Sequence, residues 1–250
     1  MNWFLRVLWS IWAIPWVVFI TLAVSSSVVV GGLCGASENF LQRLARAWGR
    51  WLLIGIGCRV SIHGQENLKP DQPYVFACNH SSALDIPVLF KALPNNFRWI
   101  AKKELFAIPV FGPAMRMAGY IPIDRSNRRA AMHSLEVASS RIKAGASVVI
   151  FPEGTRSQDG RLGEFKSGGF LLALKAEQPV TPVFINGSYR ILPPHCLWMR
   201  PGKISVHIGQ PLPVALVDIK QRDSLAQTVR EQLLQLAAAP NPAENKTIGE

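Results

Sequence analysis

The sequence lacks the cysteine spacings that zinc sites and redox centres use. Its four cysteines form no CxxC pair, and their apolar neighbours predict buried thiols in a reducing compartment: Cys34, Cys58, Cys78 and Cys196. Homeodomain, zinc-finger and RNA-recognition patterns are missing as well. Their absence weakens the interpretation of the chain as a nucleic-acid-binding protein.

Charged residues are missing from one long stretch near the N-terminus. Between Arg6 and Glu38 there is none, and this apolar run is long enough to cross the hydrocarbon core of a bilayer. The run is too long for the apolar region of a secretory signal peptide, and no convincing cleavage pattern follows it. Pro15 could kink a helix here, and the serines at 25–27 could mark a turn. A full span and an anchor in one leaflet therefore both stay open.

Acidic residues are few relative to basic ones. The 250 residues include 27 Lys and Arg against 16 Asp and Glu, and 49% of the chain is hydrophobic. A basic excess is typical of proteins that bind nucleic acid or anionic membranes, and the hydrophobicity favours the membrane. Six of the eight tryptophans lie in the first 51 residues, where an interfacial aromatic belt is expected.

Residues 38–57 have the pattern of an amphipathic helix. Arg43, Arg46 and Arg50 recur at helical spacing among apolar residues, which predicts a helix at the membrane surface with its arginines toward anionic headgroups. An ordinary amphipathic core helix is the alternative. Because the arginines follow the apolar run, the positive-inside rule places the rest of the chain on the cytoplasmic side.

From about residue 59 the pattern changes to short β-branched runs that alternate with helical stretches. Strands are expected at 59–64, 73–78, 97–102, 119–125, 147–152, 180–187 and 203–211, with helices at 86–91, 128–144, 170–177 and 221–239. This alternation predicts an α/β fold with a mixed, largely parallel sheet flanked by helices, and an N-terminal membrane-anchoring helical pair. The expected parts are anchoring helices at 1–58, an α/β domain at 59–240 and a frayed tail at 241–250.

Three polar clusters each follow a predicted strand. They are NHSSALD at 79–85, DR at 124–125 and PEGTRS at 152–157. In open α/β sheets, ligands bind at the carboxyl ends of the strands. The shared position of the clusters therefore favours one functional site at this edge of the sheet.

NHSSALD is either a catalytic pair or a polar turn. With His80 in the turn and Asp85 on the first helical turn, the carboxylate could accept from one ring nitrogen and leave the other free as a general base. In the alternative interpretation, Asn79 and the two serines only cap the helix. A nucleophilic Cys78 or serine with His80 as its base is a further alternative. It is weakened because Cys78 lies in an apolar strand and no G-x-S-x-G elbow is present.

PEGTRS has the composition of an anion site. Arg156 offers a planar set of donors that suits a phosphate, Thr155 could add a donor, and Glu153 could accept a hydroxyl. A surface turn with an internal Glu–Arg pair is the alternative. Lys166 lies at a glycine-containing helix start just downstream, where a second anion contact is possible.

Two further cations could face a polyanionic substrate. Arg125 ends the DR cluster, and Lys102 ends the strand expected at 97–102. Solvated surface charge explains Lys102 at least as well.

Four separated pieces together resemble one known family. NHSSALD, GYIPIDR at 119–125, FPEGTRS at 151–157 and VTPVFI at 180–185 occur in the order and spacing of the glycerolipid acyltransferases. The chain most resembles bacterial 1-acyl-sn-glycerol-3-phosphate acyltransferases, the PlsC-like group, over about residues 60–212. An H-x4-D match alone is weak, but H-x4-D followed by FPEGTRS at this distance is specific.

The resemblance implies transfer of an acyl group from acyl-CoA or acyl carrier protein to the free hydroxyl of lysophosphatidic acid, which gives phosphatidic acid. It implies that His80 is the general base and that Asp85 orients it. It implies no metal and no cofactor besides the thioester. The residues implied in acceptor binding are Glu153, Gly154 and Arg156, with Arg125 helping to hold the phosphate.

The partners expected from the resemblance are anionic membrane lipids, lysophosphatidic acid and the donor thioester. The expected location is the inner membrane of the cell, with the catalytic domain on the cytoplasmic side. Three alternatives stay open: an acyltransferase for another lysolipid such as lyso-ornithine lipid, a membrane-bound thioesterase or lipase, and a non-catalytic lipid-binding protein.

Overall fold

The computed structural model describes residues 3–124, 126 and 128–238, so Arg125 and the tail expected at 241–250 lie outside the described residues. The chain begins with helix α1 (Trp3–Leu33), which continues unbroken through Pro15 and the serines at 25–27. The hydroxyl of Ser27 donates to the carbonyl of Ala23, one turn back, so this polar side chain is satisfied within the helix. The turn that the serines could have marked does not form.

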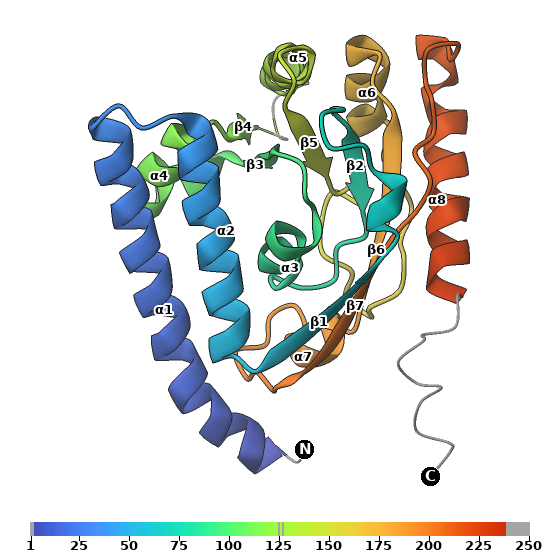
Figure 1. Ribbon diagram of the computed structural model, residues 1–250. Helices are drawn as coiled ribbons and strands as arrows, with labels where there is room; N and C mark the ends of the chain where they lie inside the picture. The colour runs from blue at the N-terminus through green and yellow to red at the C-terminus, as the bar shows by residue number, and fades with distance from the viewer. Residues whose placement is uncertain (1–2, 125, 127, 239–250) are drawn as a thin grey trace.

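Helix α2 (Glu38–Gly55) runs back beside α1 (Figure 1). It begins at the N-cap residue Ser37, whose side chain accepts from the backbone amide of Phe40. Indole groups join the two helices, because Trp16 Nε1 donates to the carbonyl of Trp51 and Trp48 Nε1 donates to Thr21 Oγ1, both at 3.0 Å. The helical pair predicted for the N-terminus is therefore present.

Seven strands form one sheet in the order β1-β7-β6-β2-β5-β3-β4. Their bounds are β1 (Cys58–His63), β2 (Val75–Cys78), β3 (Phe97–Lys102), β4 (Ile121–Ile123), β5 (Ser147–Ile150), β6 (Val180–Asn186) and β7 (Gly202–Ile208). The β6–β7 pair is antiparallel and the other pairs are parallel. The mixed, largely parallel sheet is thus confirmed, and each predicted strand overlaps an observed one.

Helices cover both faces of this sheet (Figure 1). The remaining helices are α3 (Asp85–Ala92), α4 (Phe111–Met117), α5 (Arg128–Lys143), α6 (Phe170–Ala176), α7 (Ser188–Ile191) and α8 (Arg222–Ala238). Strand β2 shows how the faces divide: Phe76 and Cys78 pack with α2 and α3, whereas Val75 and Ala77 pack with α5, α6 and α8. The short helices α4 and α7 were not predicted from the sequence.

Arg46 on α2 does not face the outside of the molecule. Its guanidinium donates to four carbonyls at the end of α3, at distances between 2.5 and 3.0 Å: Phe90, Leu93, Pro94 and Asn95. Burial lowers the pKa of Arg46. The prediction that the arginines of this helix all face headgroups is therefore wrong for Arg46, whereas Arg43 and Arg50 are exposed.

Within the described residues, α1 is the one helix long and apolar enough to cross a membrane. Many of its large side chains are exposed, including Phe4, Leu8, Ile11, Phe19 and Leu33. This apolar surface agrees with an association of the N-terminus with a membrane.

Candidate active site

The fold brings NHSSALD and PEGTRS to the same edge of the sheet. Strands β2 and β5 are parallel neighbours, so the segments that follow them leave the sheet side by side. The two segments touch directly, because the backbone amide of Ser157 donates to the carbonyl of His80 at 2.8 Å. The third predicted cluster follows β4, which lies two strands beyond β5 in the sheet.

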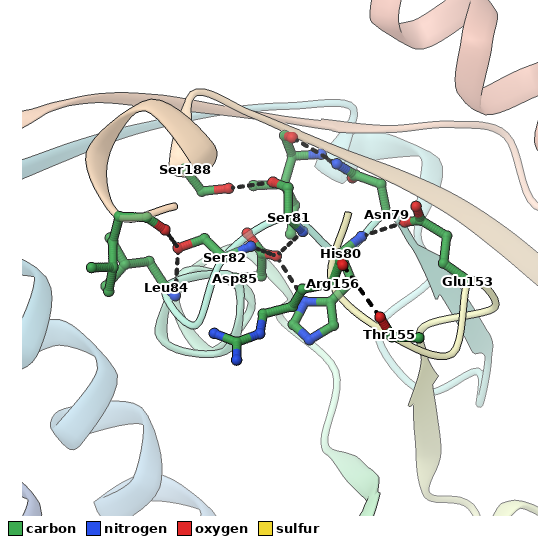
Figure 2. Close-up of polar contacts among 12 residues, drawn as sticks. Asn79, His80, Ser81, Ser82, Leu84, Asp85, Glu153, Thr155, Arg156 and Ser188 are labelled. Atoms are coloured by element: carbon green, nitrogen blue, oxygen red, sulfur yellow. Dashed lines mark hydrogen bonds and ion pairs between the residues drawn. The ribbon is translucent and has the colours of Figure 1, made fainter. Parts of the chain in front are cut away.

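His80 and Asp85 meet as the sequence predicted (Figure 2). Helix α3 begins at Asp85, whose Oδ2 accepts from His80 Nδ1 at 2.9 Å and from the amides of Ser81 and Ser82 at 2.7 and 2.9 Å. A carboxylate can only accept, so the ring proton belongs on Nδ1 and Nε2 keeps its lone pair. The Asp85 side chain is fully buried, whereas that of His80 is 16% exposed. The buried carboxylate of Asp85 therefore holds the His80 ring in a fixed orientation, with Nε2 able to accept a proton.

Phe151 holds the imidazole from another direction. Its ring stacks on that of His80, with centroids 3.9 Å apart and planes 14° from parallel. Phe151 also lies 5.7 Å from the ring of Trp99 in a second stack. The His80 ring is thus fixed by a hydrogen bond at its edge and by an aromatic ring at its face.

Glu153 connects the two segments through their backbones. Its Oε1 accepts from the amide of His80 at 2.7 Å, and its Oε2 accepts from the amide of Gly163 at 2.9 Å. Burial raises the pKa of Glu153, and these two hydrogen bonds oppose that shift. Within the described residues it makes no ion pair with Arg156, so the internal Glu–Arg pair is not found. Acceptor binding by Glu153 stays a prediction.

The capping interpretation of NHSSALD is wrong, because α3 has no side-chain cap hydrogen bond at its N-cap residue Leu84. The Oγ of Ser82 accepts from the amide of Leu84 itself, before the helix begins. Asn79 instead extends the sheet, since its side chain donates to the carbonyl and accepts from the amide of Ile185 on β6. Ser81 shares a hydrogen bond with Ser188. Cys78 is fully buried, as predicted, and burial together with the nearby Asp85 charge raises its pKa. The prediction of buried thiols also holds for Cys58 but is wrong for Cys34, which is exposed, and Cys196 is half-buried.

A cavity of about 620 Å³ opens beside His80. Its polar lining includes His80, Thr155, Arg156, Gln158 and His195. The rest of its lining is mostly apolar and comes from α1, α2, β3 and α4, with Val28, Trp48, Trp99, Ala114 and Met115 among the side chains. The site therefore combines a base, His80, and a cation, Arg156, with apolar space for a hydrocarbon chain. This combination suits an anionic ligand that carries an apolar chain.

Of the other predicted site residues, some line this cavity and others do not. Gly154 and Lys102 line it, although the Lys102 side chain is 65% exposed and lies 3.7 Å from Glu104. Lys166 is not among the lining residues, but its side chain packs over Gly154, which has a φ of +78°. Arg125 lies outside the described residues.

Sequence reasoning missed Phe151, Gln158 and His195. Phe151 precedes PEGTRS, but no sequence pattern shows that its ring stacks on His80. His195 comes from the loop between α7 and β7, more than a hundred residues after His80, and carried no motif that could have found it.

The chain is similar in sequence to known proteins. A sequence model of the acyltransferase family matches residues 59–186. A chloroplastic 1-acyl-sn-glycerol-3-phosphate acyltransferase of Arabidopsis thaliana is 38% identical over 77% of this chain and 55% of its own length. The enzyme named 1-acyl-sn-glycerol-3-phosphate acyltransferase alpha from Mus musculus is 31% identical over 88% of this chain and 76% of its own.

The fold is also similar to a solved structure. A 1-acyl-sn-glycerophosphate acyltransferase from Thermotoga maritima superposes with a TM-score of 0.81 at 24% identity, over 96% of this chain and 100% of that one. This likeness shows the fold. The chain spans about half the length of the chloroplastic plant relatives, 45% for Brassica napus and 55% for Arabidopsis thaliana.

Proposed function

Because this chain belongs to the acyltransferase family, we propose that it transfers an acyl group from a thioester to the free hydroxyl of lysophosphatidic acid and forms phosphatidic acid. The observation that carries this proposal is the cavity lined by His80, by Arg156 and by an apolar wall, with Asp85 holding His80 from behind. The names of the relatives support the acceptor, since several are described as 1-acyl-sn-glycerol-3-phosphate acyltransferases.

In the proposed reaction, His80 Nε2 takes the proton of the acceptor hydroxyl while the oxygen attacks the thioester carbonyl. The new carbon–oxygen bond forms, the carbon–sulfur bond breaks, and the imidazolium returns the proton to the departing thiolate. Asp85 holds the required tautomer and stabilises the imidazolium. The scheme needs no covalent acyl-enzyme and no metal.

Arg156 is proposed to bind the acceptor phosphate through its planar fork, with the hydroxyl of Thr155 as a further donor. The amide of Gly154 already donates to the carbonyl of Phe151 at 3.0 Å, so Gly154 is proposed only to shape the turn that carries Thr155 and Arg156. Lys102, Lys166 and Arg125 would add positive charge around it. Glu153 would position the acceptor by holding the backbones of His80 and Gly163 in place.

The apolar lining of the cavity is proposed to hold an acyl chain beside His80. The donor is acyl-CoA or acyl carrier protein, and the protein works at the inner membrane with its catalytic domain on the cytoplasmic side. The thioesterase alternative is weakened, because a buried thiol with a raised pKa supplies little nucleophilic thiolate at neutral pH.

A thiol-release assay tests the proposal. Purified protein is supplied with acyl-CoA or acyl carrier protein, together with lysophosphatidic acid, lyso-ornithine lipid or no acceptor. We expect release with lysophosphatidic acid and little without acceptor, and we expect Cys78→Ala to retain it. Equal release in water would replace the proposal with a thioesterase, and preference for lyso-ornithine lipid would change the acceptor. No turnover with any acceptor would favour a lipid-binding protein.

A further inference from the structure

The loop between α7 and β7 exposes two large apolar side chains. Leu197 is 71% exposed and Trp198 is 38% exposed. They are adjacent in sequence, whereas the following residue, Met199, is buried. A leucine and a tryptophan held at the surface of a loop are typical of a contact with a membrane or with another protein.

Hydrogen bonds fasten this loop to the N-terminal half of α1. The amide of Met199 donates to Ser10 Oγ at 2.8 Å, and Ser10 is fully buried in this contact. On α1, Phe4, Leu8 and Ile11 are 60%, 48% and 65% exposed. The loop that carries Leu197 and Trp198 therefore packs against the helix already expected at the membrane.

Three arginines gather at the same place. The guanidiniums of Arg6 and Arg200 both donate to the carbonyl of Arg190, at 3.0 and 2.6 Å, and the Arg190 side chain is itself exposed. In the part of the chain that the structure describes, none of the three forms an ion pair with a carboxylate. Like charges gathered without a counter-charge favour an external anion, and phosphate matches the guanidinium fork.

We propose that Arg6, Arg190, Leu197, Trp198 and Arg200 form a second lipid-docking surface, beside α1, that binds an anionic bilayer. Trp198 and Leu197 enter the interface, where tryptophan is favoured, and the arginines bind headgroup phosphates. The surface lies against the helix expected at the membrane, and its charge is complementary to anionic lipid. Both arguments favour a bilayer over a protein partner.

Docking of this loop has a consequence for the cavity. His195, two residues before Leu197, lines the cavity that contains His80. A loop held in the interface would place this part of the cavity wall at the bilayer surface, where a lysolipid could enter. This consequence rests on the proposed function, whereas the docking itself does not.

Photo-crosslinking tests the apolar part of the proposal without measuring acyl transfer. Benzoylphenylalanine replaces Leu197, Leu8 on α1 or Leu216, a fully exposed leucine before α8, in the full chain bound to vesicles of phosphatidylcholine and phosphatidylglycerol. We expect phospholipid adducts at positions 8 and 197 and none at 216. An adduct at position 8 without one at 197, equal yields at 197 and 216, or protein–protein adducts at 197 would overturn the proposal.

The charged part is tested with the same vesicles. Arg190→Gln is expected to lower the adduct yield at position 197 several-fold at low salt on the mixed vesicles, and to leave it unchanged on phosphatidylcholine alone. Arg129→Gln, which removes an exposed arginine on α5, is the matched control. Equal effects of the two substitutions would contradict headgroup binding by the cluster. Because neither readout involves the reaction, failure here and failure of the proposed acyl transfer are separable.

Discussion

Asp85 serves two purposes with one oxygen atom. Its Oδ2 accepts from two backbone amides and from His80 Nδ1, so it shapes the turn and also sets the tautomer of the base. Asp85→Asn keeps an acceptor for the amides but removes the charge that stabilises the imidazolium. We expect kcat to fall about 10³- to 10⁴-fold with folding intact. Steady-state kinetics with circular dichroism as a control check this, and a loss below about tenfold would contradict it.

The ring of Phe151 is expected to stabilise the imidazolium that forms on His80. A cation over an aromatic face gains about 1–2 kcal/mol, so Phe151→Leu should lower kcat about five- to thirtyfold. Phe151→Tyr keeps the ring and should retain most of the activity. If Leu and Tyr variants have equal kcat values, the ring serves only to fill space.

At the residue scale, the sequence predicted the His80–Asp85 pair but not the hydrogen bonds of Glu153 that hold the backbone beside it. The H-x4-D spacing placed His80 and Asp85 within reach because one precedes a helix and the other begins it. The partners of Glu153 could not be predicted, since His80 and Gly163 approach it only through the turns of two separate loops. Arg156 was expected to face a ligand, and it lines the cavity.

At the element scale, the seven strands were predictable because buried parallel strands are continuous β-branched runs bounded by turns. Helix α7 was not, since it is only four residues long. Helix α4 was not, since Gly112 and Pro113 near its start are typical of a turn. The inward direction of Arg46 also escaped prediction. Helical spacing gives the face of a helix, but not which neighbour covers that face.

Arg46 is expected to stabilise the junction of α2 and α3. Arg46→Ala leaves four carbonyls near the end of α3 without their charged donor, which should lower the free energy of unfolding by about 3 kcal/mol. Arg43→Ala is the matched control on the same helix, because Arg43 is exposed, and should change it by less than about 0.5 kcal/mol. Chemical denaturation in detergent measures both. Equal midpoints would contradict the inward role of Arg46.

At the scale of the whole molecule, α1 packs along its length against the rest of the chain. Ser10 contacts the loop after α7, Trp16 contacts α2, and Val28 packs with Ala114 of α4. A helix crossing the bilayer upright would draw these parts into the hydrocarbon core, where loop backbone is not tolerated. The structure therefore favours the one-leaflet anchor of the two geometries that the sequence left open.

This geometry predicts that both ends of α1 lie on the same side of the membrane. Two variants, each with Cys196 replaced by serine, report the two ends. In the first, the native Cys34 marks the end of the helix, which it follows directly. In the second, Cys34 is also replaced by serine, and Trp3→Cys marks the start. Both thiols should react with an impermeant maleimide added to the same side of sealed vesicles. Labelling from opposite sides would show that the helix spans the bilayer.

The order of elements in the sequence predicts an N-terminal anchor followed by an α/β domain. It does not predict the contact between α1 and the loop before β7, because residues 10 and 199 approach each other only in the folded chain. The cavity likewise draws side chains from α1, α2 and α4 to the strand ends. The polar half of the site was therefore predictable, and its apolar half was not.

The most direct test of the central claim is the mass of the lipid product formed by the intact protein and by His80→Ala at equal amounts of membrane-bound protein. Supplied with an acyl thioester and lysophosphatidic acid, the intact protein should form phosphatidic acid that contains the donor chain. The His80→Ala variant should form none above the level without protein. Phosphatidic acid from the variant at the rate of the intact protein, or free fatty acid alone from the intact protein, would contradict the account.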